Sequence, residues 1–273
     1  MTRPVLTLLY VPGDRPERVT KALATDADIV IVDLEDAVAP AHKDRARTET
    51  ARLLTDAGRP VQVRINHPDT PWHTDDVAML DALPGDVGAR VPKVESAGQV
   101  RALAGALPGR SLHLLLESAI GVERAFEIAT ASDQVASVGL GEADLRSDLR
   151  LSDDAGLAWV RSRVVVAARA AGLPSPHMSV HPHVRDLDGL TASCREGKTL
   201  GFLGRAAIHP AQLGPIREAF RPSDAEVERA RTVVARVGDA RTDGVGAIAL
   251  EDGTFLDVAM VQQARAVLAL TED

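Results

Sequence analysis

The chain has 273 residues, of which 45% are hydrophobic, and this length suits one large α/β domain or two small ones. Its net charge of −8 argues against nucleic acid as a partner, because phosphate backbones are bound by clustered Lys and Arg. A single cysteine, Cys194, excludes an internal disulfide. The sequence contains no signal-peptide pattern and no apolar run of ~18 residues, so we expect a cytoplasmic protein without a membrane partner.

Short β-branched, apolar runs alternate with longer segments of helical periodicity, as in 15–24, 41–54 and 155–172. This repeated βα pattern predicts a (β/α)₈ TIM barrel, which typically has about 250 residues. A doubly wound sheet is the competing fold, and the number of strands disfavours it. The eight predicted strands are residues 5–11, 28–34, 60–66, 89–94, 111–117, 135–141, 177–182 and 203–210.

The pattern changes after the eighth predicted strand. We expect residues 1–220 to form the barrel domain and residues 221–273 a small C-terminal extension. Ser223 is a suitable N-cap and Gly238 a suitable stop for a helix in this extension. A tight turn at Asp252 and Gly253, between two extended pieces, predicts a hairpin, and a last helix follows at 258–270. The extension is too small to fold independently and could cap its own or a neighbouring active site.

Charged or polar residues follow most of the predicted strands. In a barrel, this common phase places them around one mouth at the carboxyl ends of the strands, where such enzymes keep their active sites. These residues are Asp33, Glu35, Asp36, Arg64, Lys93, Glu117, Asp144 and His209.

Glu117 and Asp144 follow adjacent predicted strands, so their carboxylates could converge on a divalent cation. Mg²⁺ prefers one or two carboxylates, with water and substrate oxygens in the remaining positions. The alternative is that each carboxylate caps the helix that follows it. Arg64 on a neighbouring strand favours the metal site, since convergent charged groups mark active sites.

Two further groups of charged residues have open interpretations. Glu35 and Asp36 could orient basic residues or metal-bound waters, or could belong to a solvated acidic loop. Arg15, Arg18 and Lys21 could hold phosphates near a helix start, although three basic residues on a helix are usually a solvated face.

Three histidines lie in and beside the seventh predicted strand. His177, His181 and His183 do not have the spacing of an HExxH zinc site. We therefore expect a polar strand, with His181 and His183 lining the mouth.

Six motifs in this order resemble the citrate lyase β-subunit family, which includes citryl-CoA, malyl-CoA and citramalyl-CoA lyases and related thioesterases. The motifs are "LYVPGDRPERVTKAL", "IVDLEDAVAP", "VRIN", "LLLESAIGV", "GLGEADL" and "AIHPAQL". The resemblance runs from about residue 3 to the end and implies a TIM barrel of the phosphoenolpyruvate/pyruvate type, assembled as a trimer or hexamer. Arg205 departs from the family, whose members usually carry Lys there, and so does the histidine cluster.

The resemblance also implies site residues. Glu117 and Asp144 would bind Mg²⁺, Arg64 would contact the reacting substrate, and Asp257 would be the catalytic acid or base. Contacts with coenzyme A are implied for Tyr10, Arg15, Lys21, Ile208 and His209.

The implied activity of a stand-alone member is cleavage of a 3-hydroxyacyl-CoA to an acyl-CoA and a 2-oxo acid, or the reverse condensation. The 2-oxo acid would be oxaloacetate, glyoxylate or pyruvate. Three alternatives remain open: a malyl-CoA-type thioesterase, an aldolase of free 2-oxo acids, and a non-catalytic CoA-binding subunit.

Overall fold

The computed structural model describes residues 4–242, 248–249, 255–256 and 258–271. The chain divides into two compact units, Val5–Ala219 and Met1–Pro4 with Phe220–Asp273. Within the described ranges, none of the helices combines the length and the apolar content that a membrane crossing requires.

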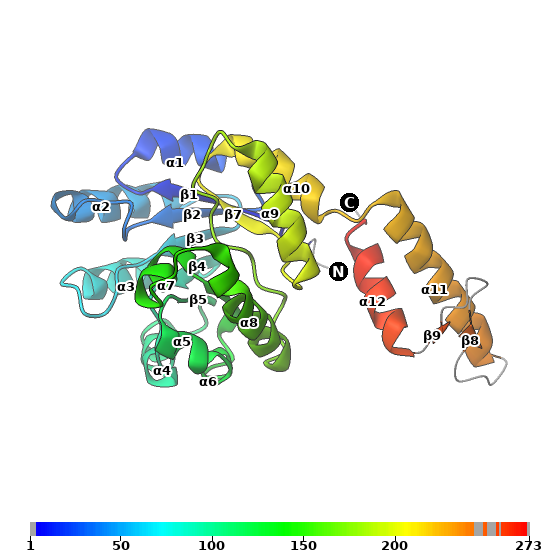
Figure 1. The fold of residues 1–273 in the computed structure, drawn as a ribbon. Coiled ribbons are helices and arrows are strands. Elements are labelled where there is room, and N and C mark those ends of the chain that lie inside the picture. The colour runs from blue at the N-terminus through cyan, green and yellow to red at the C-terminus, as the bar shows by residue number, and fades with distance from the viewer. Residues whose placement is uncertain (1–3, 243–247, 250–254, 257, 272–273) are drawn as a thin grey trace. The chain divides into compact units, whose positions relative to one another are not determined.

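The larger unit is built on one curled sheet of parallel strands. Among the described residues the sheet has seven strands in the order β6-β5-β4-β3-β2-β1-β7, so neighbours in the chain are mostly neighbours in the sheet (Figure 1). The strands are β1 (Thr7–Pro12), β2 (Ile29–Asp33), β3 (Val61–Arg64), β4 (Val87–Val91), β5 (Leu112–Leu116), β6 (Val135–Leu140) and β7 (Arg205–Ala207). The protein therefore has an α/β fold of the TIM-barrel type, as the sequence predicts.

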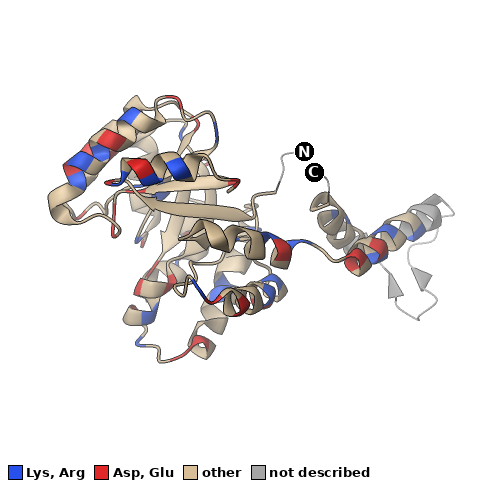
Figure 2. Cartoon of the chain, turned by 90° about the horizontal axis from the view of Figure 1, so that it is seen from above, with Lys and Arg blue, Asp and Glu red and all other residues tan. Residues whose placement is uncertain are grey.

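Helices connect the strands and lie outside the sheet (Figure 1). Lys and Arg are interspersed with Asp and Glu on several of these helices, as expected for faces turned to solvent (Figure 2). The helices are α1 (Pro16–Leu23), α2 (Lys43–Leu54), α3 (His73–Ala82), α4 (Ala97–Ala106), α5 (Ala119–Glu123), α6 (Ala125–Ala129), α7 (Glu142–Asp148), α8 (Ala158–Ala170), α9 (Leu187–Thr199) and α10 (Leu213–Phe220). Short 3₁₀ turns cover η1 (Pro40–His42), η2 (Asp154–Leu157) and η3 (Pro210–Gln212).

Burial of the strands on both faces explains why their sequences are nearly continuous apolar runs. Val30, Ile31 and Val32, three successive residues of β2, are all fully buried although their side chains point to alternate faces. The helices cover one face, and the inward side chains fill the other.

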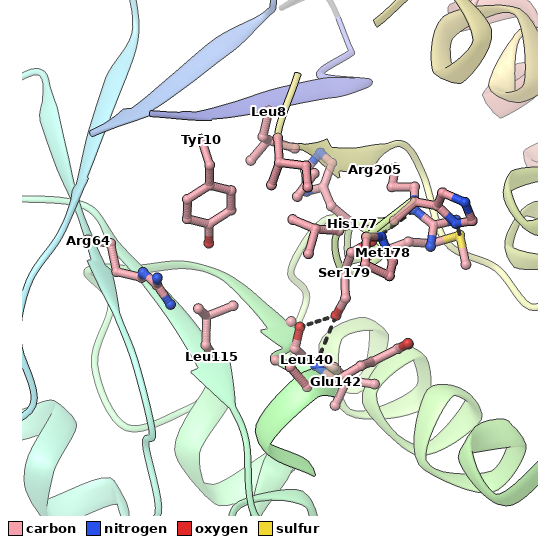
Figure 3. A pocket seen from close by; sticks show the side chains of 18 of the residues that line it. Leu8, Tyr10, Arg64, Leu115, Leu140, Glu142, His177, Met178, Ser179 and Arg205 are labelled. Carbon is pink, nitrogen blue, oxygen red and sulfur yellow. Dashed lines mark hydrogen bonds between the residues drawn. The ribbon is translucent and has the colours of Figure 1, made fainter. Parts of the chain in front are cut away.

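The prediction of a full strand at 177–182 is wrong, because this segment makes only one bridge, Met178 to Arg205 beside β7. Pro176 and Pro182 bound the segment and have no N–H to donate to a ladder. On the β6 side, the Ser179 hydroxyl replaces the ladder: it donates to Leu140 O and accepts from Glu142 N (Figure 3). The segment is thus joined to β7 by one bridge and its backbone hydrogen bonds, and to β6 by the Ser179 side chain.

The smaller unit is a pair of packed helices with a short hairpin between them. It contains α11 (Asp224–Thr242), β8 (Ile248–Ala249), β9 (Phe255–Leu256) and α12 (Val258–Ala269). The predicted hairpin is confirmed by the antiparallel pairing of β8 with β9. Ala230, Val233, Val261 and Ala264 form the apolar seam between the two helices.

The two predicted ends of α11 have different outcomes. Ser223 caps the start as predicted, since its hydroxyl accepts from Glu226 N at 3.2 Å. The prediction that Gly238 ends the helix is wrong, because α11 continues to Thr242. A glycine weakens a helix by about 1 kcal/mol but ends it only where the backbone turns left-handed. Asp252, Gly253 and Asp257 lie outside the described residues.

Two partly buried histidines predict that the larger unit loses stability in acid. Burial, helped by the Arg90 charge, lowers the pKa of His113 to about 3, and burial lowers the pKa of His177 to about 4. Between these values and the ordinary value of about 6.5, the unfolded chain binds protons that the folded chain refuses. The free energy of unfolding should therefore fall as the pH drops below about 6.5, by about 1.4 kcal/mol per pH unit for each histidine.

Denaturant unfolding at pH 7 and pH 5 measures this loss. Replacing His113 with Gln should remove one histidine's share, about 2 kcal/mol over this interval. The same replacement of the exposed His183 should leave the pH dependence unchanged. An identical pH dependence in wild type and His113→Gln would contradict the prediction.

Candidate active site

The carboxyl ends of the parallel strands bring the predicted charged residues together. Asp33 ends β2 and Arg64 ends β3, and the two are register partners. Lys93 follows β4, Glu117 follows β5, and Asp144 lies in the first turn of α7 after β6. Ion pairs link all five to one cluster, together with Glu35 and Asp36.

Arg64 is fixed by two carboxylates. Its Nε and Nη2 donate to the two oxygens of Asp33 at 2.8 and 2.6 Å, and Nη1 lies 2.8 Å from Glu35 Oε2. Its guanidinium carbon lies 5.4 Å from the centre of the Tyr10 ring. Bidentate pairing of this kind sets the direction of a guanidinium as well as its position. Arg64 therefore presents a rigid positive charge at the mouth.

The buried side chain of Lys43 holds the loop after β2 in place. Its ammonium donates to Leu34 O at 2.6 Å, to Glu35 O at 2.7 Å and to Asn66 Oδ1 at 2.6 Å. Glu35 is buried and pairs with Arg64 and Lys93, whereas Asp36 is 61% exposed and lies 3.6 Å from Arg64 Nη1. The geometry of both agrees with orienting basic residues, and the description as a solvated loop applies to Asp36 alone.

Glu117 does not cap the helix that follows it. Ser118 is the N-cap of α5 and accepts from Gly121 N, so the capping alternative has no role left for Glu117. The Glu117 carboxylate lies against Gly141, where a Cβ atom would be 2.4 Å from Oε1. Only a glycine at 141 leaves room for this carboxylate.

The surroundings of Glu117 are those of a cation ligand. Burial, with the Glu35 charge adding to it, raises the pKa of Glu117 to about 8. Its Oε2 has no hydrogen-bond partner among the described residues. Asp144 is half exposed and is not the N-cap of α7, a position held by Gly141. A divalent cation bound to Glu117 and Asp144 would give the buried Glu117 Oε2 a partner. It would also offset the repulsion of Glu117 by Glu35 and Asp144.

This donor set fits Mg²⁺ better than a transition metal. No three His, Cys, Asp or Glu side chains of the described residues gather into a complete ligand set. Mg²⁺ is commonly held by one or two carboxylates and completes its shell with water and substrate oxygens. Glu117 and Asp144 supply such a pair, and neither ligand is a histidine or a thiolate.

A cavity of about 930 Å³ opens at this cluster. Figure 3 shows Tyr10 and Arg64 on one side of it and Met178, Ser179 and Arg205 on the other. Of the residues predicted for the site, the cavity is lined by Tyr10, Asp36, Arg64, Glu117, Asp144 and Ile208. This volume accommodates a small acid together with part of a larger ligand.

The other predicted coenzyme A contacts, which are Arg15, Lys21 and His209, do not line this cavity. Arg15 is exposed, with its Nε 3.8 Å from Asp14, and Lys21 is in the last turn of α1. His209 Nδ1 accepts from Ala211 N and so caps η3. Arg18, which the sequence places in the same basic group, does line the cavity.

Several polar residues of the site carry no assigned role in the sequence interpretation. Lys93 is recognisable there only by its place after a strand. Arg161 is buried and makes two 2.8 Å hydrogen bonds to Glu142 at the cavity wall. Arg205 donates to Ser179 O at 2.9 Å and to Ser193 Oγ at 3.0 Å, and so ties residues 177–182 to α9. A buried charge within an apolar pattern is the sequence signal for both arginines.

The three histidines do not form a metal centre with one another. His177 is partly buried and its Nε2 lies 3.0 Å from Val5 O. The rings of His181 and His183 meet edge to face at 5.7 Å, and both residues line the cavity.

A curled parallel sheet with acidic and basic side chains around a cavity at its strand ends defines an α/β-barrel type of protein with a candidate cation site. Residues 6–210 match the HpcH/HpaI aldolase/citrate lyase family, and the chain belongs to this family. The resemblance seen in the motifs is thereby confirmed.

Two relatives and one solved structure match nearly the whole chain. The chain is 38% identical to a (3S)-malyl-CoA thioesterase of Cereibacter sphaeroides, covering 98% of this chain and 95% of the relative. It is 32% identical to a citrate lyase subunit beta of Leuconostoc mesenteroides subsp. cremoris, covering 97% and 92%. The structure of CitE from Mycobacterium tuberculosis in complex with magnesium, acetoacetate and coenzyme A superposes with a TM-score of 0.85, at 35% identity and with 98% and 99% covered.

Proposed function

We propose that this protein is a Mg²⁺-dependent carbon–carbon lyase. It cleaves a 3-hydroxyacyl-CoA of the citryl, malyl or citramalyl type to an acyl-CoA and a 2-oxo acid, or catalyses the reverse condensation. The observation that carries the proposal is the convergence of Glu117, Asp144 and Arg64 at one cavity, with a Glu117 oxygen that lacks a hydrogen-bond partner among the described residues. The CitE structure with magnesium, acetoacetate and coenzyme A supports the same ligands here.

The reaction requires loss of the hydroxyl proton, cleavage of the C2–C3 bond and stabilisation of the thioester enolate. Glu117 and Asp144 would hold Mg²⁺, which supplies Lewis-acid polarisation of the substrate oxygens. Arg64, pinned by Asp33, would stabilise the negative oxygen that develops during cleavage. Glu35 and Asp36 would keep Arg64 and Lys93 in place. Asp257 would carry the proton at the enolate carbon.

The larger end of the substrate would leave the cavity past the first strand. Tyr10 and Ile208 line the cavity, and Arg18 adds a positive charge to its lining. We assign the coenzyme A moiety to this side, with Arg15, Lys21 and His209 as the outer contacts. Anionic phosphates and adenosine would thus meet the basic side of an otherwise acidic protein.

Assembly and location complete the proposal. We infer a cytoplasmic homo-oligomer, a trimer or hexamer, in which residues 221–273 cap an active site of the same or a neighbouring subunit. Exposed large apolar side chains in the larger unit support association: Ile120, Phe126, Trp159 and Val166.

Thioester hydrolysis in the same site is the second candidate, because the (3S)-malyl-CoA thioesterase is 38% identical over nearly the whole chain. The two activities share their metal and their thioester substrate. They differ in the bond that breaks and therefore in the products.

One assay separates these functions. The purified protein with MgCl₂ is given malyl-CoA, citryl-CoA or citramalyl-CoA, and the 2-oxo acid and free thiol are measured in parallel. A lyase releases the 2-oxo acid without free thiol, and a thioesterase releases free thiol without a 2-oxo acid. Calorimetry with acetyl-CoA, with and without Mg²⁺ and a 2-oxo acid, completes the test. If neither turnover nor CoA binding is found, the acyl-CoA proposal fails and an aldolase of free 2-oxo acids replaces it.

A further inference from the structure

Lys93 occupies the point at which the carboxylates of the site converge. Its ammonium contacts Glu35 and lies 3.4 Å from Asp144 Oδ2, 3.5 Å from Asp36 Oδ2 and 3.7 Å from Glu117 Oε2. Four carboxylates from two loops and a helix thus surround one flexible cation. The attraction of these four carboxylates would draw any free cation to the position that the Lys93 ammonium occupies.

The backbone of Lys93 is built for this placement. Its φ of +51° is in the left-handed region, which residues other than glycine seldom adopt. Val94 N, the next donor in the chain, is held by Leu115 O at 3.0 Å, so the bend is fixed to β5. Such backbone conformations persist where the surrounding structure enforces them and are concentrated at functional sites.

Lys93 also forms an ion pair with each of the two proposed metal ligands. Among the described residues, the ion pairs of Glu117 and Asp144 are with Lys93, whereas Arg64 is committed to Asp33 and Glu35. A Mg²⁺ ion on Glu117 and Asp144 would therefore lie close to the ammonium. The charges of Mg²⁺ and of the Lys93 ammonium would then repel each other strongly, because the site is partly buried.

We propose that Lys93 is a built-in counter-cation that competes with Mg²⁺ for Glu117 and Asp144. This inference rests on the proposed function, because it takes these two carboxylates as the metal ligands. In the metal-free protein Lys93 holds the carboxylates together and keeps the site assembled. When Mg²⁺ binds, the side chain turns to Glu35 and Asp36, with which it already pairs. The metal-free site is thus preorganised, and the intrinsic affinity for Mg²⁺ is kept low.

Titration of the full chain with MgCl₂ alone, at one pH and without thioester, tests the competition. Replacing Lys93 with Met should tighten Mg²⁺ binding by about tenfold or more, because the competing charge is removed. Lys93→Arg retains the charge and should bind Mg²⁺ within a few-fold of wild type. Arg101→Met removes one positive charge from an exposed position on α4 and should leave the affinity unchanged.

Two results would overturn the inference. Unchanged or weaker Mg²⁺ binding by folded Lys93→Met would show that the ammonium only positions the carboxylates. If that variant does not fold, as judged by circular dichroism, Lys93→Gln takes its place with the same expected tightening. Glu117→Gln identifies the other failure: if wild type and Glu117→Gln bind Mg²⁺ equally, the metal site itself is misplaced and the proposed function fails with it.

Discussion

Replacing Glu117 with Gln is expected to abolish Mg²⁺ binding and to lower turnover by about 10³-fold or more. Gln has the shape of Glu and fits the space that Gly141 leaves, so the effect reports the lost charge. Removing several kcal/mol of Lewis-acid stabilisation corresponds to a factor of this size, since each 1.36 kcal/mol is about tenfold in rate.

Two measurements check this expectation. Calorimetric titration with MgCl₂ reports the metal, and release of the 2-oxo acid from the thioester substrate reports turnover. Glu123→Gln, in the exposed last turn of α5, is the matched control and should behave like wild type. Turnover within a few-fold of wild type in Glu117→Gln would mean that this carboxylate is structural.

The second large effect is expected for Arg64→Lys. Lysine keeps the positive charge but cannot make the paired hydrogen bonds to Asp33 at 2.8 and 2.6 Å while reaching Glu35. The charge would lose its fixed direction toward the cavity. Loss of one preorganised oxyanion donor costs about 10²- to 10³-fold in kcat, and we expect that range here.

The separation of kcat from KM identifies the cause. An effect on kcat with Mg²⁺ affinity retained supports a role in the transition state, whereas an effect on KM alone points to substrate binding. Arg52→Lys is the control, since Arg52 pairs with Glu49 through Nε and Nη2 on the exposed face of α2. Equal kinetics for Arg64→Lys and wild type would contradict the assigned role.

Much of the fold is predictable from local sequence patterns, without tertiary information. Strands β1–β6 are apolar runs because both of their faces are buried, and their spacing predicts the parallel order. The cap at Ser223 depends only on nearby atoms and was equally predictable. The seventh strand was not, because the local pattern cannot show that residue pairing is limited to Met178 with Arg205 and that the Ser179 side chain takes the place of backbone pairing with β6.

The candidate site, like the fold, is partly predictable from the sequence and partly determined by the tertiary structure. The sequence by itself determined that charged residues follow the strands with a common phase, and parallel strands necessarily bring such residues to one edge. Only the tertiary structure decided which side chains meet. The curl of the sheet places Lys93 among four carboxylates, Gly141 makes room for Glu117, and Ser118 takes over the helix cap. These contacts join residues from different βα units, and their geometry depends on packing, which no local pattern encodes.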